Sequence, residues 1–153
     1  MTLAQTLTQV FNANFVAYYR SHVAHVNTVG RNFYADHKLL QKIYEYFGDN
    51  IDTLAEKLRT IRATMPNDLN TVLNLTPIVD MPTLGTSEEL LQLVLENLEL
   101  MIDQYHELND AAEAVNYIDI SNYAQDQIGQ IAKFRWMLTA TMDGKDEPES
   151  DMY

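Results

Sequence analysis

The sequence contains no cysteine among its 153 residues, which excludes disulfide bonds, thiolate metal sites and cysteine nucleophiles. It also lacks an uninterrupted apolar stretch long enough to cross a bilayer. Its first ten residues do not show the basic and apolar segments of a secretory signal. These absences favour a protein of the cytoplasm, without a membrane span.

Basic residues are few, because 10 Lys and Arg stand against 22 Asp and Glu, for a formal net charge of −12. A nucleic-acid-binding protein needs a basic surface to displace the counterions of phosphates, so DNA binding is not expected. An acidic surface suits a protein that attracts cations, although solubility alone explains it as well. The length favours one domain with a substantial core.

Four long helices are predicted from apolar residues that recur every three or four positions. They cover about Leu3 to Val29, Phe33 to Thr64, Thr86 to Val115 and Ile120 to Met142. The first ends at a glycine, the second ends before a proline, and the third begins with a capping-box pattern. Trp136 fits the apolar spacing of the fourth helix and is expected in the core.

The connection between the second and third predicted helices is long and rich in proline. Asp68 to Leu75 is compatible with a short helix inside it. Two helical hairpins joined by one long crossover describe a ferritin-like bundle. The expected fold is therefore all-α, a four-helix bundle over residues 1–142 with a short extra helix in the crossover between helices 2 and 3. Residues 143–153 are acidic and are predicted to form a mobile tail.

Two histidines and two carboxylates form the pattern most suggestive of chemistry. His25 and His37 lie on either side of the first predicted turn, so an antiparallel hairpin would bring their rings together. Asp52 and Glu56 lie one turn apart on the second predicted helix and share a face. Two imidazoles and two carboxylates with open positions are a suitable ligand set for non-haem iron.

One chain cannot bring these four side chains to one metal ion. His37 and Asp52 are fifteen positions apart, and a continuous helix separates them by about 22 Å, at about 1.5 Å per residue. At about 100° per residue, Asp52 and Glu56 also point about 120° and 160° away from the centre of the helix's apolar stripe. If the four residues share one site, the carboxylates must come from a second copy, and a two-fold dimer with antiparallel second helices creates two identical sites.

The same residues resemble the signature of the Dps family of miniferritins. The family pattern has a histidine, a glycine five positions later, an aromatic residue beyond it, a second histidine twelve positions after the first, and then D-x-x-A-E-R. His25, Gly30, His37 and the segment Asp52–Glu56 match it at these spacings. The similarity extends over about residues 11 to 140 and includes the late segment Lys133–Leu138.

This resemblance implies a four-helix bundle whose dimers assemble into a hollow shell of twelve copies. It implies oxidation of ferrous iron by hydrogen peroxide, or less readily by dioxygen, with storage of ferric mineral and protection against oxidative damage. By position, His25 and His37 of one protomer and Asp52 and Glu56 of its neighbour are the expected iron ligands and ferroxidase residues.

Three positions depart from the family pattern. Val26 stands where tryptophan is common next to the iron, which bears on how peroxide is handled. Gln41 replaces a frequent aspartate, so a second iron is expected to bind more weakly. Asn122 replaces an aspartate near the start of the last helix, and Asp119 and Asp126 are spaced to line a cation pore instead. Neither end carries the lysine-rich tail of DNA-binding members.

Two other functions are compatible with the sequence. A DNA-compacting protein of the same fold with weak iron chemistry is disfavoured by the charge. An intrachain di-iron bundle oxidase is suggested by the D-x-x-H motif of Asp103 and His106. Such a site requires a motif of this kind on two helices and more carboxylates inside the bundle. His22 lies one turn before His25, where packing is a commoner role than accessory ligation.

Overall fold

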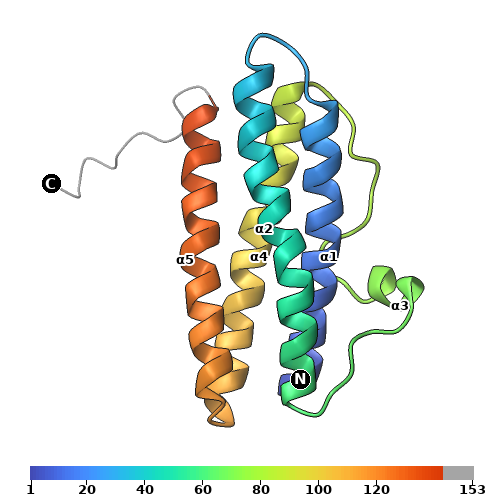
Figure 1. Cartoon of the computed structure of the whole chain (residues 1–153), viewed down its shortest axis with the longest axis vertical. Coiled ribbons are helices and arrows are strands. Elements are labelled where there is room, and N and C mark those ends of the chain that lie inside the picture. Colours follow the sequence, from blue (N-terminus) through green and yellow to red (C-terminus); the bar gives the residue numbers. More distant parts are fainter. Residues whose placement is uncertain (143–153) are drawn as a thin grey trace, which may run out of the picture.

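The computed structural model describes residues 1–142, and in this part of the chain it contains helices and no strand. The helices are α1 (Leu3–Asn27), α2 (Phe33–Thr60), α3 (Leu69–Asn74), α4 (Ser87–Ala114) and α5 (Ile118–Thr141). The four long helices lie side by side in one bundle (Figure 1). The predicted all-α bundle with a short extra helix in the crossover is confirmed. The predicted tail, residues 143–153, lies outside the described residues.

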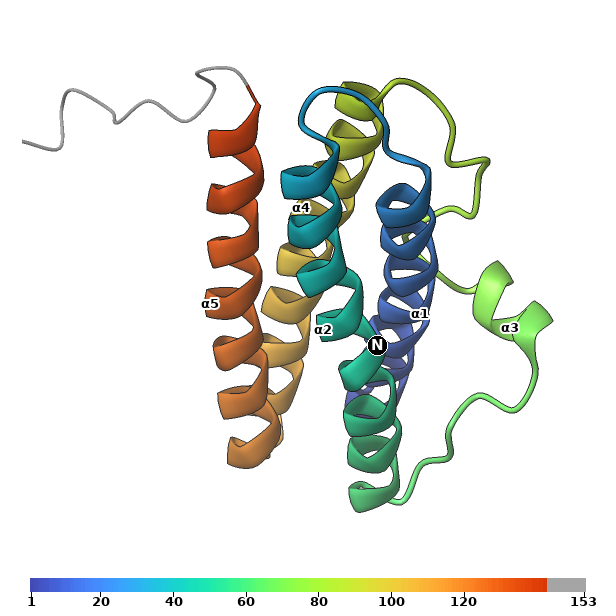
Figure 2. The same ribbon diagram turned by 45° about the horizontal axis from the view of Figure 1, so that its top comes forward.

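The crossover runs along the outside of the bundle. It leaves the end of α2, passes through α3 and reaches the opposite end of the bundle, where α4 begins (Figure 1). Helix α3 packs beside α1, on the side of the bundle away from α5 (Figure 2). The two hairpins, α1–α2 and α4–α5, therefore face each other with the crossover outside them. None of the described helices is long and apolar enough to cross a membrane.

Helix α2 ends at Thr60, four residues before the predicted end. Arg62 adopts a left-handed backbone with φ of 66°, and the Ala63 N–H donates to the Leu58 carbonyl at 2.9 Å. This is the hydrogen-bond pattern that terminates helices, and glycine is its usual left-handed residue. Because an arginine holds the position here, composition did not signal the end of the helix.

The second hairpin is closed in the same way. Asn116 has φ of 62°, and the Tyr117 N–H donates to the Ala112 carbonyl at 2.9 Å, which ends α4 and lets α5 begin two residues later. At the start of α4, the Thr86 hydroxyl accepts from the Glu89 N–H at 3.2 Å, which is one of the two hydrogen bonds of the predicted capping box. The Glu89 carboxylate accepts from that hydroxyl at 3.1 Å.

The core lies between the four long helices. Fully buried side chains come from each of them, among them Leu7, Phe11, Leu40, Phe47, Leu54, Leu98, Met101, Tyr105, Ile131 and Leu138. Burying a side chain of this size contributes about 1.5–3 kcal/mol. Trp136 is 57% exposed, so its predicted place in the core is wrong. Phe134 and Leu138 are buried, and a residue midway between them on a helix points to the opposite face.

Candidate metal centre

The rings of His25 and His37 form a reciprocal pair at the α1–α2 turn. His25 lies in the last turn of α1 and His37 in the second turn of α2. The Nδ1 of His25 donates to the His37 carbonyl at 2.7 Å, and the Nδ1 of His37 donates to the His25 carbonyl at 2.8 Å. The two rings are stacked, with centroids 3.7 Å apart and planes 19° apart.

These hydrogen bonds fix which nitrogen of each ring carries the proton. A carbonyl oxygen only accepts, so each Nδ1 must be protonated. In a neutral imidazole the other nitrogen, Nε2, then keeps its lone pair. A histidine whose Nδ1–H is held by a backbone carbonyl is the usual form of a metal ligand, because its ring is oriented and its Nε2 is available. The pair therefore offers two Nε2 donors side by side.

The surroundings of His25 favour the neutral form that a metal needs. Its side chain is only 7% exposed, and burial is the main cause that lowers its pKa. The hydrogen bond to the His37 carbonyl opposes this shift, and the charge that His37 would carry adds to it. His37 itself is half-buried.

Aromatic rings lie against the histidine pair. Tyr44 lies 4.9 Å from His25 between ring centroids, and Phe33 lies 4.9 Å from His37. Tyr44 comes seven residues after His37, so two helical turns place both on one face of α2. His22 stacks on Tyr44 with centroids 4.2 Å apart. This stacking fits the packing role expected for His22.

Asp52 and Glu56 form a second pair, on the surface of α2. Both side chains are exposed. A hydrogen bond shared with Asp52 raises the pKa of Glu56, and the negative charge of Asp52 acts in the same direction. Two carboxylates this close repel each other when both are ionised, and a bound cation relieves that repulsion. The chemistry of this pair therefore suits a metal ion.

The chain does not bring the two pairs together. Helix α2 runs without a break from Phe33 to Thr60, so His37 and Asp52 remain about 22 Å apart along it. Among residues 1–142, no group of three or more His, Asp or Glu side chains is placed to hold a metal ion. Within one chain the histidine pair and the carboxylate pair are therefore two separate half-sites. That two copies of the chain join them into one metal site stays a prediction.

The interior position of an intrachain di-iron site is filled by other side chains. Tyr123 donates to the Asn50 amide oxygen at 2.9 Å, and Tyr46 donates to the amide oxygen of Gln127. Tyr105 is fully buried beside them, with its ring 6.0 Å from that of Tyr123. Burial raises the pKa of Tyr123 to about 12. The centre of the bundle thus holds neutral phenols and amides in place of carboxylates.

The remaining candidates lie on the surface. Asp103 and His106 are exposed on α4, so their motif does not point into the bundle. Asp119 and Asp126 are exposed on α5, and a separation of seven residues places them on one face. Their part in a cation pore stays a prediction. Of the departures, Val26 is 60% exposed, and the Gln41 amide donates to the Glu45 carboxylate at 2.8 Å.

Comparison with known proteins identifies the family. Residues 4–145 match the ferritin-like domain family. The "DNA protection during starvation protein" of Helicobacter pylori strain J99 is 29% identical over 126 residues, which are 82% of this chain and 88% of that protein. The chain belongs to the ferritin-like family, as a Dps-type miniferritin.

Solved structures show the same fold. The X-ray structure of Dps from Thermosynechococcus elongatus superposes on this miniferritin with a TM-score of 0.88, at 19% identity, covering 98% of this chain and 93% of that one. The crystal structure of Helicobacter cinaedi CAIP gives a TM-score of 0.85 at 29% identity, covering 92% and 99%. Such coverage spans the whole bundle, crossover included.

Proposed function

We propose that this Dps-type miniferritin is a ferroxidase and an iron store that works as a shell of twelve copies. The observation that carries the proposal is the reciprocal histidine pair, which presents two oriented Nε2 donors and forms no group of three or more possible metal ligands with His, Asp or Glu side chains of residues 1–142. The two imidazoles are oriented for metal binding but lack carboxylate ligands from the described part of their own chain. A second copy of the chain is therefore the proposed source of those carboxylates.

A two-fold dimer supplies the carboxylates in a simple way. If two α2 helices cross antiparallel near Tyr44, the seven residues from His37 to the axis match the eight from the axis to Asp52. His37 of one copy then lies opposite Asp52 of the other, and Glu56 follows one turn beyond. His25 joins through its stacking on His37. The symmetry produces the site twice in each dimer.

The proposed ligands divide the chemistry between them. The carboxylates of Asp52 and Glu56 supply negative charge and hard oxygen atoms, which favour ferric over ferrous iron. The two imidazoles fix the direction of binding. Two ferrous ions give one electron each to one molecule of peroxide, which takes up two protons and leaves as two waters. Because peroxide receives both electrons, no hydroxyl radical is released, and this is the basis of the proposed protection.

Delivery of ferrous iron follows from the charge. A net charge of −12 per chain attracts cations, and Asp119 and Asp126 are proposed to line the pore through which they pass. Ferric iron hydrolyses and is stored as mineral inside the shell. A cytoplasmic location, where ferrous iron and peroxide meet, is part of this proposal. DNA binding is not, because the same charge opposes it.

A direct test loads the protein with ferrous iron, adds peroxide, follows the ferric absorbance and sizes the product by gel filtration. We expect rapid oxidation and a shell-sized species that retains iron. His37→Ala and Asp52→Ala should each slow oxidation strongly. His106→Ala and Asp103→Ala are matched controls, because they remove the same residue types from exposed positions on α4. Equal oxidation rates in all four variants would refute the proposal.

A further inference from the structure

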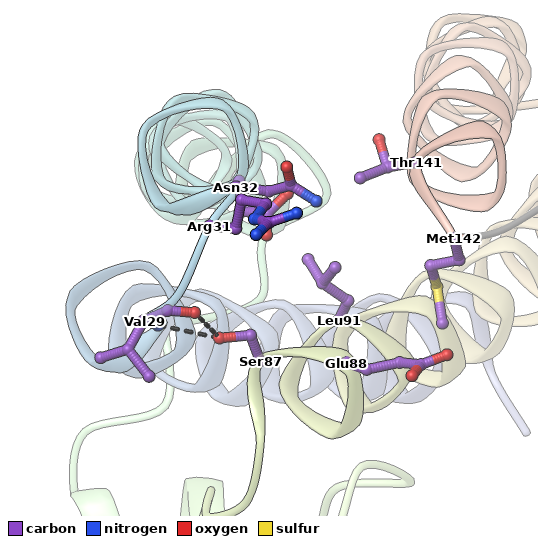
Figure 3. Close-up of a pocket in the computed structure, with 9 residues that line it drawn as sticks. Val29, Arg31, Asn32, Ser87, Glu88, Leu91, Thr141 and Met142 are labelled. Carbon is purple, nitrogen blue, oxygen red and sulfur yellow. Dashed lines mark hydrogen bonds between the residues drawn. The ribbon is translucent and has the colours of Figure 1, made fainter.

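A pocket of about 210 Å3 lies at the end of the bundle where three segments meet. Figure 3 shows Arg31 and Asn32 of the α1–α2 turn on one side, Ser87 and Glu88 of the first turn of α4 across from them, and the end of α5 beside both. None of the four proposed iron ligands lines this pocket. It is therefore separate from the candidate metal centre.

A buried carboxylate without a partner lines the pocket. Asp36 is only 5% exposed, and its Oδ1 accepts no hydrogen bond within the part of the chain that the structure describes. Its helix partly favours the charge, since Asp36 lies in the first turn of α2. An isolated buried carboxylate is nevertheless costly, and proteins normally pair such a group or use it to bind a cation.

A second polar side chain at the pocket, that of Asn32, also lacks its usual hydrogen bond. Asn32 is the N-cap residue of α2, yet its side chain makes no capping hydrogen bond. Asparagine at this position usually accepts from a backbone N–H of the first turn. Here its amide lies at the pocket instead (Figure 3).

We propose that this pocket binds a divalent cation, with Asp36 as its anionic anchor and the amide oxygen of Asn32 as a second ligand. The donors are oxygens and include no imidazole, which favours hard cations such as Mg2+, Mn2+ or Ca2+. A volume of about 210 Å3 leaves room for an ion together with several waters. An ion that keeps several water ligands, as Mg2+ and Mn2+ commonly do, fits this space.

Arg31 is the competing occupant. It lines the same pocket and is exposed, so its guanidinium is free to turn toward solvent or toward Asp36. In the structure it donates no hydrogen bond to Oδ1 of Asp36. If Arg31 were the natural partner of this carboxylate, its removal would destabilise the protein and no metal would bind. The two arrangements therefore make opposite predictions.

The experiment titrates the full chain with Mn2+ and quantifies the free ion by electron paramagnetic resonance. Every protein compared, the parent included, also carries Asp52→Ala and Glu56→Ala, so that the proposed iron site binds little Mn2+. We expect Asp36→Asn to remove one bound Mn2+ per chain or to raise its dissociation constant at least tenfold. Asp103→Asn, an exposed aspartate on α4, is the matched control and should change nothing. Unchanged Mn2+ binding in the Asp36→Asn variant overturns the proposal.

Thermal unfolding provides a second readout. Without metal, Asp36→Asn should raise Tm, because it removes an unpaired buried charge. Saturating Mn2+ should raise the Tm of the parent and leave that of Asp36→Asn unchanged. Asn32→Ala, whose side chain is exposed and makes no cap, should fold normally and weaken Mn2+ binding severalfold. A lower Tm in Arg31→Ala, together with no effect of Mn2+ on the parent, would show that Arg31 is the partner and the proposal wrong.

Discussion

Replacing His37 by alanine and by asparagine separates its structural role from its role as a ligand. Alanine removes both the Nδ1–H that donates to the His25 carbonyl at 2.8 Å and the Nε2 that is available to a metal. Asparagine keeps an N–H donor at about the position of Nδ1 but has nothing at the position of Nε2. The pair of variants therefore tests the two functions of one ring independently.

The magnitudes follow from the contacts. A hydrogen bond of this kind contributes about 0.5–1.5 kcal/mol, and a part-buried acceptor left without a donor adds to the loss. The bond from His25 Nδ1 to the carbonyl of residue 37 survives, because that carbonyl belongs to the backbone. We expect His37→Ala to lower the free energy of unfolding by about 1–2 kcal/mol. For a chain of this length that corresponds to about 2–8 °C in Tm.

The assay compares metal-free unfolding at equal protein concentration with the visible absorption of bound Co2+, whose intensity reports imidazole ligation. His37→Asn should regain most of the lost stability and still fail to give the Co2+ spectrum of the parent. Wild-type stability in His37→Ala would refute the inferred hydrogen bond. A parental Co2+ spectrum in His37→Asn would refute the assignment of Nε2 as a ligand.

Three further predictions concern the core, the surface pair and pH. Phe47→Ala should lower the free energy of unfolding by about 3–5 kcal/mol, measured in guanidinium, because Phe47 is fully buried. Asp52→Ala and Glu56→Ala should abolish rapid iron oxidation while leaving the Tm of the metal-free protein within about 1–2 °C, because both side chains are exposed. The pKa of Tyr123, raised to about 12 by burial, makes the folded state hold its proton more tightly than the unfolded state does. Tyr123 alone should therefore make stability fall by about 1.4 kcal/mol per pH unit as the pH rises from about 10 to 12, and Tyr123→Phe should reduce the slope by that amount. Part of the slope remains in this variant, because burial also raises the pKa of Tyr46 and Tyr105.

Most of the fold could be predicted because the signals are local and repeated. The three- and four-residue spacing of apolar side chains defines each long helix, and the proline-rich connection marks the crossover. The errors lie where one residue departs from its usual behaviour. Arg62 adopts a left-handed backbone that glycine usually takes, so the predicted end of α2 lies four residues too late, whereas the end of α4 was predicted to within one residue. Trp136 is apolar, yet it lies on the face of α5 opposite its buried neighbours.

The candidate site was predicted in part, for a related reason. The proximity of His25 and His37 follows from the short turn between two helices, and the distance to Asp52 follows from helical rise. The reciprocal hydrogen bonds could not be foreseen, because they depend on how two helix ends are offset. The sequence pattern does not single out Asp36, because a charged residue is expected to face solvent. It precedes Leu40 by one helical turn, on the buried stripe of α2.

The central claim, that two copies complete each other's site, is tested most directly by mixing two inactive variants. Neither His37→Ala nor Asp52→Ala contains an intact ligand set alone. A dimer of one chain of each kind contains one damaged site and one intact site, formed by His37 of one chain and Asp52 of the other. After the variants are unfolded together and reassembled in equal amounts, we predict recovery of about a quarter of the wild-type ferroxidase activity, because half of the dimers are mixed and each has one of two sites intact. Activity that stays at the level of the separate variants in verified mixed assemblies would contradict the account.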